Sequence, residues 1–371
     1  MKKFFLVPLV ILMVGALIFG GCGGQEPAPA PAPSPAPTPA PTPAETIELT
    51  YSYWVPPIPL MARIHNVWAE HVERHTDGRV KVQLIGGAVL GPPADHLEIC
   101  LSGRADITWI AIGHFPGVFP YSDVRFLPFL FPSGAVGGRI FWEMTEQYLL
   151  DTEYKDVKVL FTHPTSVFQL ISNKQVHTLE DLKGMKIVMD SSVQVEMTEY
   201  LGATAVFVPE GEIFTTLERG LVDGRWRDWE GVVTWKEMEV TKYRTGGIDL
   251  AANQGMSIMN LDSWDKLPAD VKGVIDDMRL GHSIWAGLSF DEMSLSRLTE
   301  LQEYDRKVGN PDIYWLPKDE KAKWVAAVEP MYDWWVGDME SKGNNQAREL
   351  LEFVQAKSAL FSGALTGEEA R

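Results

Sequence analysis

The chain contains 371 residues, of which 33 are basic and 50 acidic, and its formal net charge is −17. An acidic chain without basic clusters argues against nucleic acid as a partner and against docking on anionic lipid. Cys22 and Cys100 are its only cysteines, which excludes a disulfide framework. The length and a hydrophobic content of 45% allow two ordinary domains, each with its own core.

The N-terminus has the pattern of a secretory signal. Lys2-Lys3 is followed by the apolar run 4–19 and then by Gly20-Gly21-Cys22. This order is similar to a bacterial lipoprotein signal over residues 1–21, in which the cysteine receives the lipid. An uncleaved signal anchor is the alternative, because about 18 apolar residues approach the length that spans a bilayer. Both alternatives place the rest of the chain outside the cytoplasm, in the periplasm or at the cell surface, and attached to a membrane.

Residues 22–45 are expected to form a tether. Proline occupies every odd position from Pro27 to Pro43 and alternates mostly with alanine. Such a composition favours extended polyproline II at about 3.1 Å per residue, so the segment can hold a soluble body roughly 50 Å from a membrane.

The body begins with an α/β unit. Residues 48–54 alternate as a strand, a helix with one apolar face follows, and residues 80–85 form the next strand. After a loop rich in glycine and proline, a helical run ends at Gly103, and Asp106 leads into a further strand. Cys100, near the end of that helical run, is expected to be a small core residue.

A second unit repeats this order. Residues 203–208 form a strand, a helical run ends at Gly220, and Asp223 again lies three residues after the glycine. Two such units in one chain predict two lobes with a cleft between them. Since open parallel sheets bind ligands beyond the carboxyl ends of their strands, a two-lobed binding protein is the first hypothesis.

The remaining patterns complete the two α/β lobes. A long helix from Pro268 to about Val308 can run along both of them. Further strands are predicted at 157–161, 167–171, 186–189 and 313–315. The expected parts are lobe I at 46–165 and about 254–290, lobe II with the spanning helix at 166–253 and about 291–330, and C-terminal helices at 331–371.

Seven short segments follow one another in a specific order within residues 46–355. They are Gly78–Val82, Gly103–Ile107, Phe126–Phe131, Leu179–Ile187, Gly220–Gly224, Val240–Tyr243 and Met259–Pro268. Together they resemble the solute-binding proteins of TRAP transporters (tripartite ATP-independent periplasmic transporters), the DctP-like family. The resemblance implies a type II-like periplasmic-binding-protein fold, in which hinge strands join two α/β lobes and a long helix spans both. It also implies that a small organic acid is enclosed by hinge closure and delivered to a small and a large integral membrane subunit.

The family's carboxylate-clamping arginine normally follows Lys-Ile in the strand after Leu-Lys-Gly, and here that position is Val188. A valine cannot hold a carboxylate as a planar guanidinium does. Arg225 and Arg227 follow the Asp-Gly pair after which the family places ligand contacts, so either could supply the missing cation. The alternative is that they form ion pairs with Asp228 or Glu230 on the surface of the lobe.

Aromatic side chains at strand ends are the other candidate contacts. Trp54 ends the first strand and Trp109 follows the first Gly-x-x-Asp unit, where the cleft is expected. If residues after Gly224 are extended, Trp229 shares a face with the two arginines and Trp226 lies on the other, and either could stack on a ring-bearing solute. His163 could donate to an anion. Core packing is the alternative for each of these side chains.

Two other classes compete with a binding protein for organic acids. One is a hydrolase or other enzyme on a two-lobed scaffold, and the other is a sensory ectodomain that binds a neutral solute. His71 and His75 have the spacing of a zinc helix, but Val72 stands where that motif requires glutamate. The sequence therefore favours a binding protein, and we expect no catalytic residue, metal or cofactor.

Overall fold

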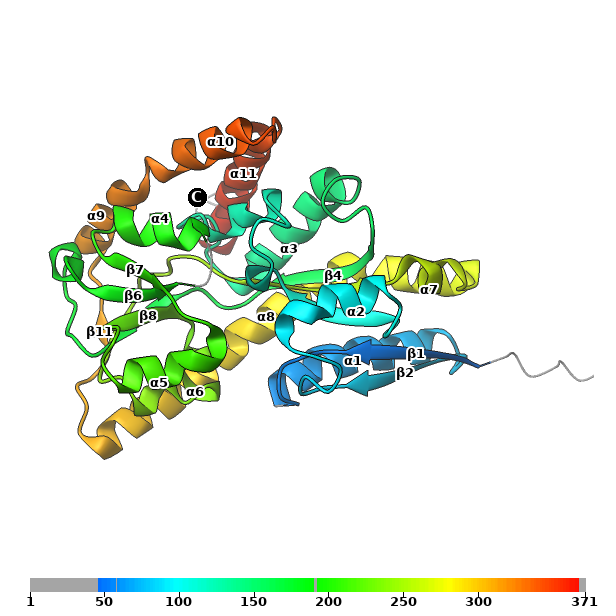
Figure 1. Ribbon diagram of the computed structural model, residues 1–371, viewed down its shortest axis with the longest axis horizontal. Coiled ribbons are helices and arrows are strands. Elements are labelled where there is room, and N and C mark those ends of the chain that lie inside the picture. Colours follow the sequence, from blue (N-terminus) through cyan, green and yellow to red (C-terminus); the bar gives the residue numbers. More distant parts are fainter. Residues whose placement is uncertain (1–45, 58, 190–191, 367–371) are drawn as a thin grey trace, which may run out of the picture. The chain divides into compact units, whose positions relative to one another are not determined.

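The computed structural model describes residues 46–57, 59–189 and 192–366, and the predicted signal, tether and lipidated Cys22 lie outside them. Residues 44–371 belong to one compact unit. Two mixed sheets organise this unit (Figure 1), and each defines a lobe. The strands of lobe I, in the spatial order β2-β1-β3-β10-β4, are β1 (Ile47–Ser52), β2 (Val80–Ile85), β3 (Ile107–Ala111), β4 (Lys158–Pro164) and β10 (Gln254–Met259).

Lobe II has the strand order β11-β9-β5-β8-β6-β7. Its strands are β5 (Gln169–Ser172), β6 (Lys186–Met189), β7 (Thr204–Phe207), β8 (Gly224–Arg227), β9 (Tyr243–Gly246) and β11 (Tyr314–Trp315). The strand prediction at 186–189 matches β6 residue for residue, and that at 80–85 matches β2. Both segments carry β-branched residues between turn signals, so local sequence was sufficient to define them.

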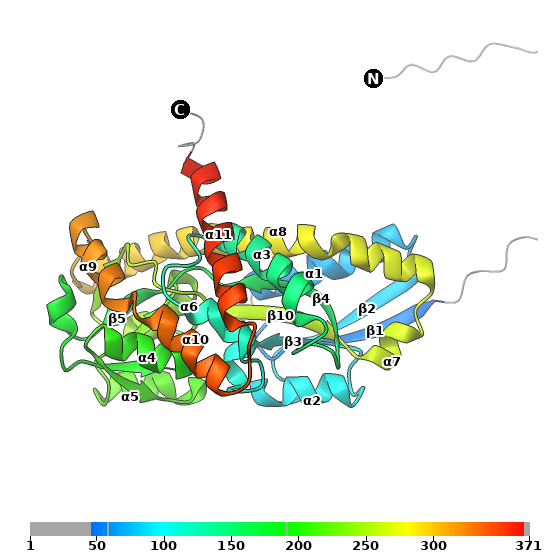
Figure 2. The same cartoon turned by 90° about the horizontal axis from the view of Figure 1, so that it is seen from above.

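Helices cover the sheets and join the lobes. They are α1 (Pro59–His75), α2 (His96–Leu101), α3 (Gly134–Met144), α4 (Ser192–Tyr200), α5 (Ile213–Glu218), α6 (Trp229–Thr234), α7 (Leu261–Asp265), α8 (Ala269–Val308), α9 (Lys318–Val328), α10 (Met331–Ser341) and α11 (Ala347–Thr366). The 40-residue α8 contacts α1 and β4 of lobe I and α6 of lobe II (Figure 2). This confirms the expected two-lobed α/β fold with a long spanning helix.

The two repeated units share one structural device. In lobe I, Oδ2 of Asp106 accepts a hydrogen bond from the backbone N–H of Thr50 at 2.8 Å. In lobe II, Oδ2 of Asp223 accepts one from the backbone N–H of Lys186 at 2.9 Å. Each aspartate therefore ties the start of its own strand to a neighbouring strand, and this shared role explains the repeated Gly-x-x-Asp pattern.

Two chain segments cross between the lobes beside each other. The backbone N–H of Thr165 donates to the carbonyl of Asn253 at 2.9 Å, and that of Phe168 donates to Ala251 at 2.7 Å. These crossings lie between β4 and β5 and between β9 and β10. They are the connections that a hinge between the lobes requires.

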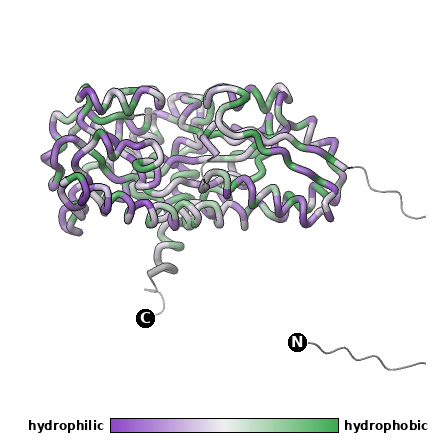
Figure 3. The backbone as a smooth tube through the Cα atoms, turned by 90° about the horizontal axis from the view of Figure 1, so that it is seen from below, coloured by the Kyte–Doolittle hydropathy of each residue, from purple (hydrophilic) through white to green (hydrophobic). Residues whose placement is uncertain are grey.

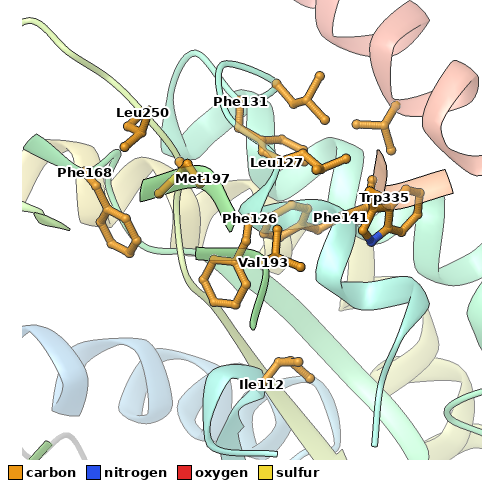
Figure 4. Close-up of a cluster of buried hydrophobic side chains, with 14 of the residues drawn as sticks. Ile112, Phe126, Leu127, Phe131, Phe141, Phe168, Val193, Met197, Leu250 and Trp335 are labelled. Atoms are coloured by element: carbon orange, nitrogen blue, oxygen red, sulfur yellow. The ribbon is translucent and has the colours of Figure 1, made fainter. Parts of the chain in front are cut away.

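The core continues from the lobes into the C-terminal helices. Phe126, Phe131, Phe141, Phe168 from the first crossing and Trp335 of α10 belong to one cluster of buried hydrophobic side chains (Figure 4). The segment 115–132 is thus part of this core. Cys100 is fully buried, as expected. Hydrophobic and hydrophilic residues alternate along the chain (Figure 3), and no helix within the described ranges is long and apolar enough to cross a bilayer.

Helices α3 and α8 cross at very short range. A Cβ on Gly287 of α8 would collide with the carbonyl oxygen of Gly134 in α3. At the N-terminus of α3, Oδ1 of Asp291 accepts from the backbone N–H of Gly134 at 2.8 Å, and Oδ2 accepts from Ala135 at 3.0 Å. Glycine is required because only a residue without Cβ lets the two backbones approach so closely.

Candidate functional site

A cavity lies between the lobes, where strands of both sheets end. Its enclosed space measures about 90 Å³. Lobe I contributes residues that follow β1 and β3, and lobe II contributes the ends of β6 and β8, as the rule for open α/β sheets predicts. The lining includes Trp54, Trp109, His114, Phe168, Val188, Glu210, Arg225, Trp226, Arg227, Asp228, Glu230, Trp235, Asn253 and Gln254.

The wall from lobe I is aromatic. The ring centroids of Trp54 and Trp109 lie 5.6 Å apart, and His114 meets Trp54 edge-on at 5.0 Å. Trp235, from the chain after α6 in lobe II, is nearly parallel to Trp54, with 6.3 Å between centroids and 26° between planes. The expected positions of Trp54 and Trp109 at the cleft therefore agree with the structure, and Trp235 completes the stack from the opposite lobe.

His163 lies behind this wall. Its Nε2 accepts a hydrogen bond from Nε1 of Trp109 at 3.1 Å, and its Nδ1 lies 3.2 Å from the carbonyl oxygen of Pro164. Burial lowers the pKa of His163 to about 4, so the ring is neutral at physiological pH. Nε2 thus holds Trp109 and Nδ1 faces a backbone carbonyl, so both ring nitrogens have partners inside the protein, and His163 is not among the described residues that line the cavity.

Val188 and Arg225 are direct neighbours in the lobe II sheet. The parallel strands β6 and β8 pair with Val188 opposite Arg225, so both side chains project from the same face. Both side chains line the cavity. A guanidinium is therefore present one strand away from the position at which the family carries its clamping arginine.

Both arginines at this edge have carboxylate partners inside the protein. Oε2 of Glu210 lies 2.7 Å from Nη2 of Arg225, and Oε1 of Glu210 lies 3.2 Å from Nη2 of Arg227. Glu237, which is 1% exposed, also forms an ion pair with Arg225. The surface pairs with Asp228 or Glu230 that the sequence suggested do not form; the actual partners come from turns 12 to 17 residues away and are largely buried.

The carboxylates around this network differ in charge. Burial alone would raise the pKa of Glu210, but the charges of Arg225 and Arg227 outweigh it and lower the pKa to about 2. Burial, reinforced by the neighbouring Glu230 carboxylate, raises the pKa of Asp228 to about 7. Glu210 is thus permanently ionised, whereas Asp228 changes charge near neutral pH.

Trp226 lies within β8 on the face opposite to Arg225 and Arg227, as predicted, whereas Trp229 does not lie on a strand. Strand β8 ends at Arg227, because the side chain of Asp228 caps α6 by accepting from the backbone N–H of Gly231 at 3.2 Å. Trp229 is consequently the first residue of a helix and packs in the lobe II core, away from the cavity lining. Trp226 touches the cavity, but it is 3% exposed and its Nε1 donates to Oγ1 of Thr198 at 2.9 Å.

Sequence patterns gave little signal for the remaining site residues. Glu210 and Glu237 lie in short 3₁₀ turns, and Trp235 follows a helix of only six residues. None belongs to a periodic pattern long enough to assign a face. Asn253 and Gln254 also line the cavity, beside the second crossing.

Comparisons with known proteins agree with this architecture. A family model for "Bacterial extracellular solute-binding protein, family 7", DctP, matches residues 52–338, which is more than half of the chain. A solute-binding protein of Verminephrobacter eiseniae is 28% identical over 273 residues, 72% of this chain and 78% of that protein. The C4-dicarboxylate-binding periplasmic protein DctP of Rhodobacter capsulatus is 24% identical over 298 residues, 78% of this chain and 86% of its own.

Solved structures show the same fold. A TRAP solute-binding protein from Rhodoferax ferrireducens, crystallised with copurified benzoate, has a TM-score of 0.78 and 27% identity over 86% of this chain and 100% of its own. A TRAP periplasmic solute-binding protein from Desulfovibrio salexigens has a TM-score of 0.75 and 27% identity over 85% and 97%. This chain therefore belongs to family 7 of the bacterial extracellular solute-binding proteins, the DctP family of TRAP transport systems.

Proposed function

We propose that the chain captures a small organic acid with an aromatic part in the interlobe cavity and performs no chemistry on it. The observation that carries this proposal is the near-parallel pair of indoles from opposite lobes, Trp54 and Trp235, whose centroids lie 6.3 Å apart. A planar ring between them requires about 3.5 Å on each side, roughly 7 Å in total. The two centroids are closer than this, so the hinge must open for an aromatic guest to enter between the indoles.

The acidic part of the solute is proposed to meet Arg225 and Arg227. Arg225 pairs with Val188 across β6 and β8, both arginines line the cavity, and a guanidinium can hold a carboxylate by charge-assisted hydrogen bonds. The related protein from Rhodoferax ferrireducens was crystallised with benzoate, a small aromatic acid. This relationship supports the same ligand class for the present cavity.

The test is binding of benzoate and benzamide to protein that lacks residues 1–22, measured by calorimetry. We expect benzoate to bind to the wild type. Arg225→Ala or Arg227→Ala should weaken the binding of benzoate by about 1.5–3 kcal/mol, roughly 10- to 150-fold, and leave the binding of benzamide unchanged. If both variants bind acid and amide as the wild type does, the arginines are not solute ligands and a neutral solute replaces the acid.

Membrane attachment is proposed to depend on a lipid on Cys22, followed by the tether 22–45. We expect Cys22→Ala to release the processed protein from the membrane fraction, with the wild type as the comparison. If the variant remains equally membrane-bound after signal processing, an N-terminal anchor replaces the lipid. Delivery to TRAP membrane subunits follows from the family, and solute uptake in cells that contain both subunits tests it.

The absence of chemistry is tested directly. Purified protein incubated with a bound acid should return the compound unchanged, as judged by mass spectrometry. Turnover that a substitution in the cavity abolishes would favour the enzyme alternative instead.

A further inference from the structure

Asp228 carries a buried oxygen that the fold leaves unused. The residue is 4% exposed and lines the cavity. Its Oδ1 caps α6 through the backbone N–H of Gly231, whereas its Oδ2 has no hydrogen-bond partner within the described part of the chain. A buried carboxylate oxygen without a partner is costly, so it is either protonated or satisfied by a group that enters the cavity.

The charges that face Asp228 do not neutralise it. Glu230 in α6 and Glu237 in the turn after α6 raise its proton affinity, whereas Arg227 at the end of β8 and the hydrogen bond from the backbone N–H of Gly231 lower it. Nη2 of Arg227 is already within 3.2 Å of Glu210. No ion pair within 4.0 Å joins Arg227 to Asp228 in the described residues, so Asp228 retains its affinity for a positive group.

The cavity as a whole is acidic rather than basic. Among its described lining residues, the guanidinium groups of Arg225 and Arg227 face three carboxylates, those of Glu210, Asp228 and Glu230. A solute that is only an anion would add negative charge to this surface. A solute that also brings an ammonium group would balance Asp228 and would be attracted to the faces of the surrounding indoles.

We propose that the solute is an amino acid in the broad sense, an organic acid that also carries a protonated amine, and that Asp228 receives the amine. This inference rests on the proposed function, which supplies the acid and the aromatic part. It makes Asp228 a residue that determines specificity, because its Oδ2 distinguishes an amino acid from the same acid without the amine.

The experiment compares rigid ligands of one shape. 4-(Aminomethyl)benzoate carries both groups, 4-methylbenzoate lacks the amine, 4-methylbenzylamine lacks the acid, and 4-(hydroxymethyl)benzoate replaces the amine by a neutral donor. A flexible set of phenylalanine, 3-phenylpropanoate and 2-phenylethylamine covers other geometries. We expect the wild type to bind at least one amino acid tenfold or more tightly than its counterparts without the amine or without the acid.

Asp228→Asn is the decisive variant, because asparagine caps a helix as well as aspartate but carries no charge. The variant should bind the amino acid tenfold or more weakly than the wild type does. It should bind the acid without the amine as tightly as the wild type, or more tightly. Glu212→Gln removes an exposed charge from the neighbouring Glu210–Glu212 turn and should change neither. Equal melting temperatures for wild type and Asp228→Asn establish that the fold is intact.

Other outcomes separate this inference from the proposed function. Equal affinity for the amino acid and the acid without the amine, or no effect of Asp228→Asn, overturns the inference and leaves the organic acid standing. If 4-(hydroxymethyl)benzoate binds as tightly as 4-(aminomethyl)benzoate, a neutral donor is sufficient and the positive charge is not recognised. This result also overturns the inference. An amine without the acid that binds as tightly as the amino acid refutes the organic-acid proposal while supporting the role of Asp228. Binding of none of the compounds overturns both.

Discussion

The two walls of the cavity differ in chemistry. Lobe I presents the rings of Trp54, Trp109 and His114, whereas the lobe II wall carries the guanidinium groups of Arg225 and Arg227 among carboxylates. Stacking on rings depends little on salt or pH, while an ion-pair network depends on both. On the proposed function, the rings of lobe I, together with Trp235 of lobe II, would stack on the solute, and the charged groups of lobe II would select it by charge.

The two walls also differ in how they are supported. Trp109 is held by one neutral hydrogen bond to His163. Arg225, by contrast, is 3% exposed and forms ion pairs with Glu210 and Glu237. Removal of the guanidinium would therefore leave these two carboxylates without that partner. Substitutions on the lobe II wall should therefore disturb the fold more than substitutions on the lobe I wall.

The largest effect is expected for stability on the lobe II side. Arg225→Ala leaves Glu237, at 1% exposure, with only the more distant Arg227, at 3.9 Å, as an ion-pair partner among the described residues, and should lower the free energy of unfolding by about 3–5 kcal/mol. Denaturant unfolding measures it, and the exposed Arg219→Ala on the same lobe is the control, expected to change little. A change below about 1 kcal/mol for Arg225→Ala would mean that the network is not structural.

The close crossing of α3 and α8 offers a second test of stability. Gly287→Ala places a Cβ against the carbonyl oxygen of Gly134 and should destabilise the protein by about 1–3 kcal/mol. Gly281→Ala in the same helix has nothing within 4 Å of the new Cβ, and should be neutral or stabilising by up to about 1 kcal/mol. Equal behaviour of the two variants would show that the crossing is not tight.

A pH titration of ligand binding tests the charged wall of lobe II. Because the pKa of Asp228 is raised to about 7, its ionised fraction falls from roughly 90% at pH 8 to roughly 10% at pH 6. Affinity for 4-(aminomethyl)benzoate should therefore fall roughly tenfold over this range. Glu210, with a pKa of about 2, stays ionised throughout.

His114 also lines the cavity, so the contribution of Asp228 has to be isolated. Asp228→Asn is therefore measured alongside the wild type. The difference between the two pH profiles reports Asp228, and identical profiles would assign the dependence to another group.

The smallest effect is expected for the stack of Trp54 from lobe I on Trp235 from lobe II. Trp54→Ala or Trp235→Ala removes one face of the stack and should weaken an aromatic acid by about 0.5–1.5 kcal/mol, roughly 2- to 12-fold, with little effect on an acetate-sized acid. Trp315→Ala, which changes a half-exposed indole on lobe II outside the cavity lining, is the control. An equal loss for aromatic and aliphatic acids would mean that the indoles shape the cavity without stacking on the solute.

Sequence alone determined the elements and the fold. Strands such as β2 and β6 and the spanning helix α8 could be predicted because hydrophobic periodicity and turn residues act over a few positions. The repeated Gly-x-x-Asp pattern pointed to two related units, and Asp106 and Asp223 indeed have the same role in both. The cavity position followed from the rule that ligands bind beyond strand ends.

Only the tertiary structure decided the chemistry of the site. The stack of Trp54 on Trp235 joins residues from opposite lobes, and the partners of Arg225 come from turns without any periodic pattern. The helix cap made by Asp228 ended β8 and turned Trp229 into the core. Side-chain pairing across loops depends on how the chain closes in space, and short-range sequence patterns contain no information about that closure.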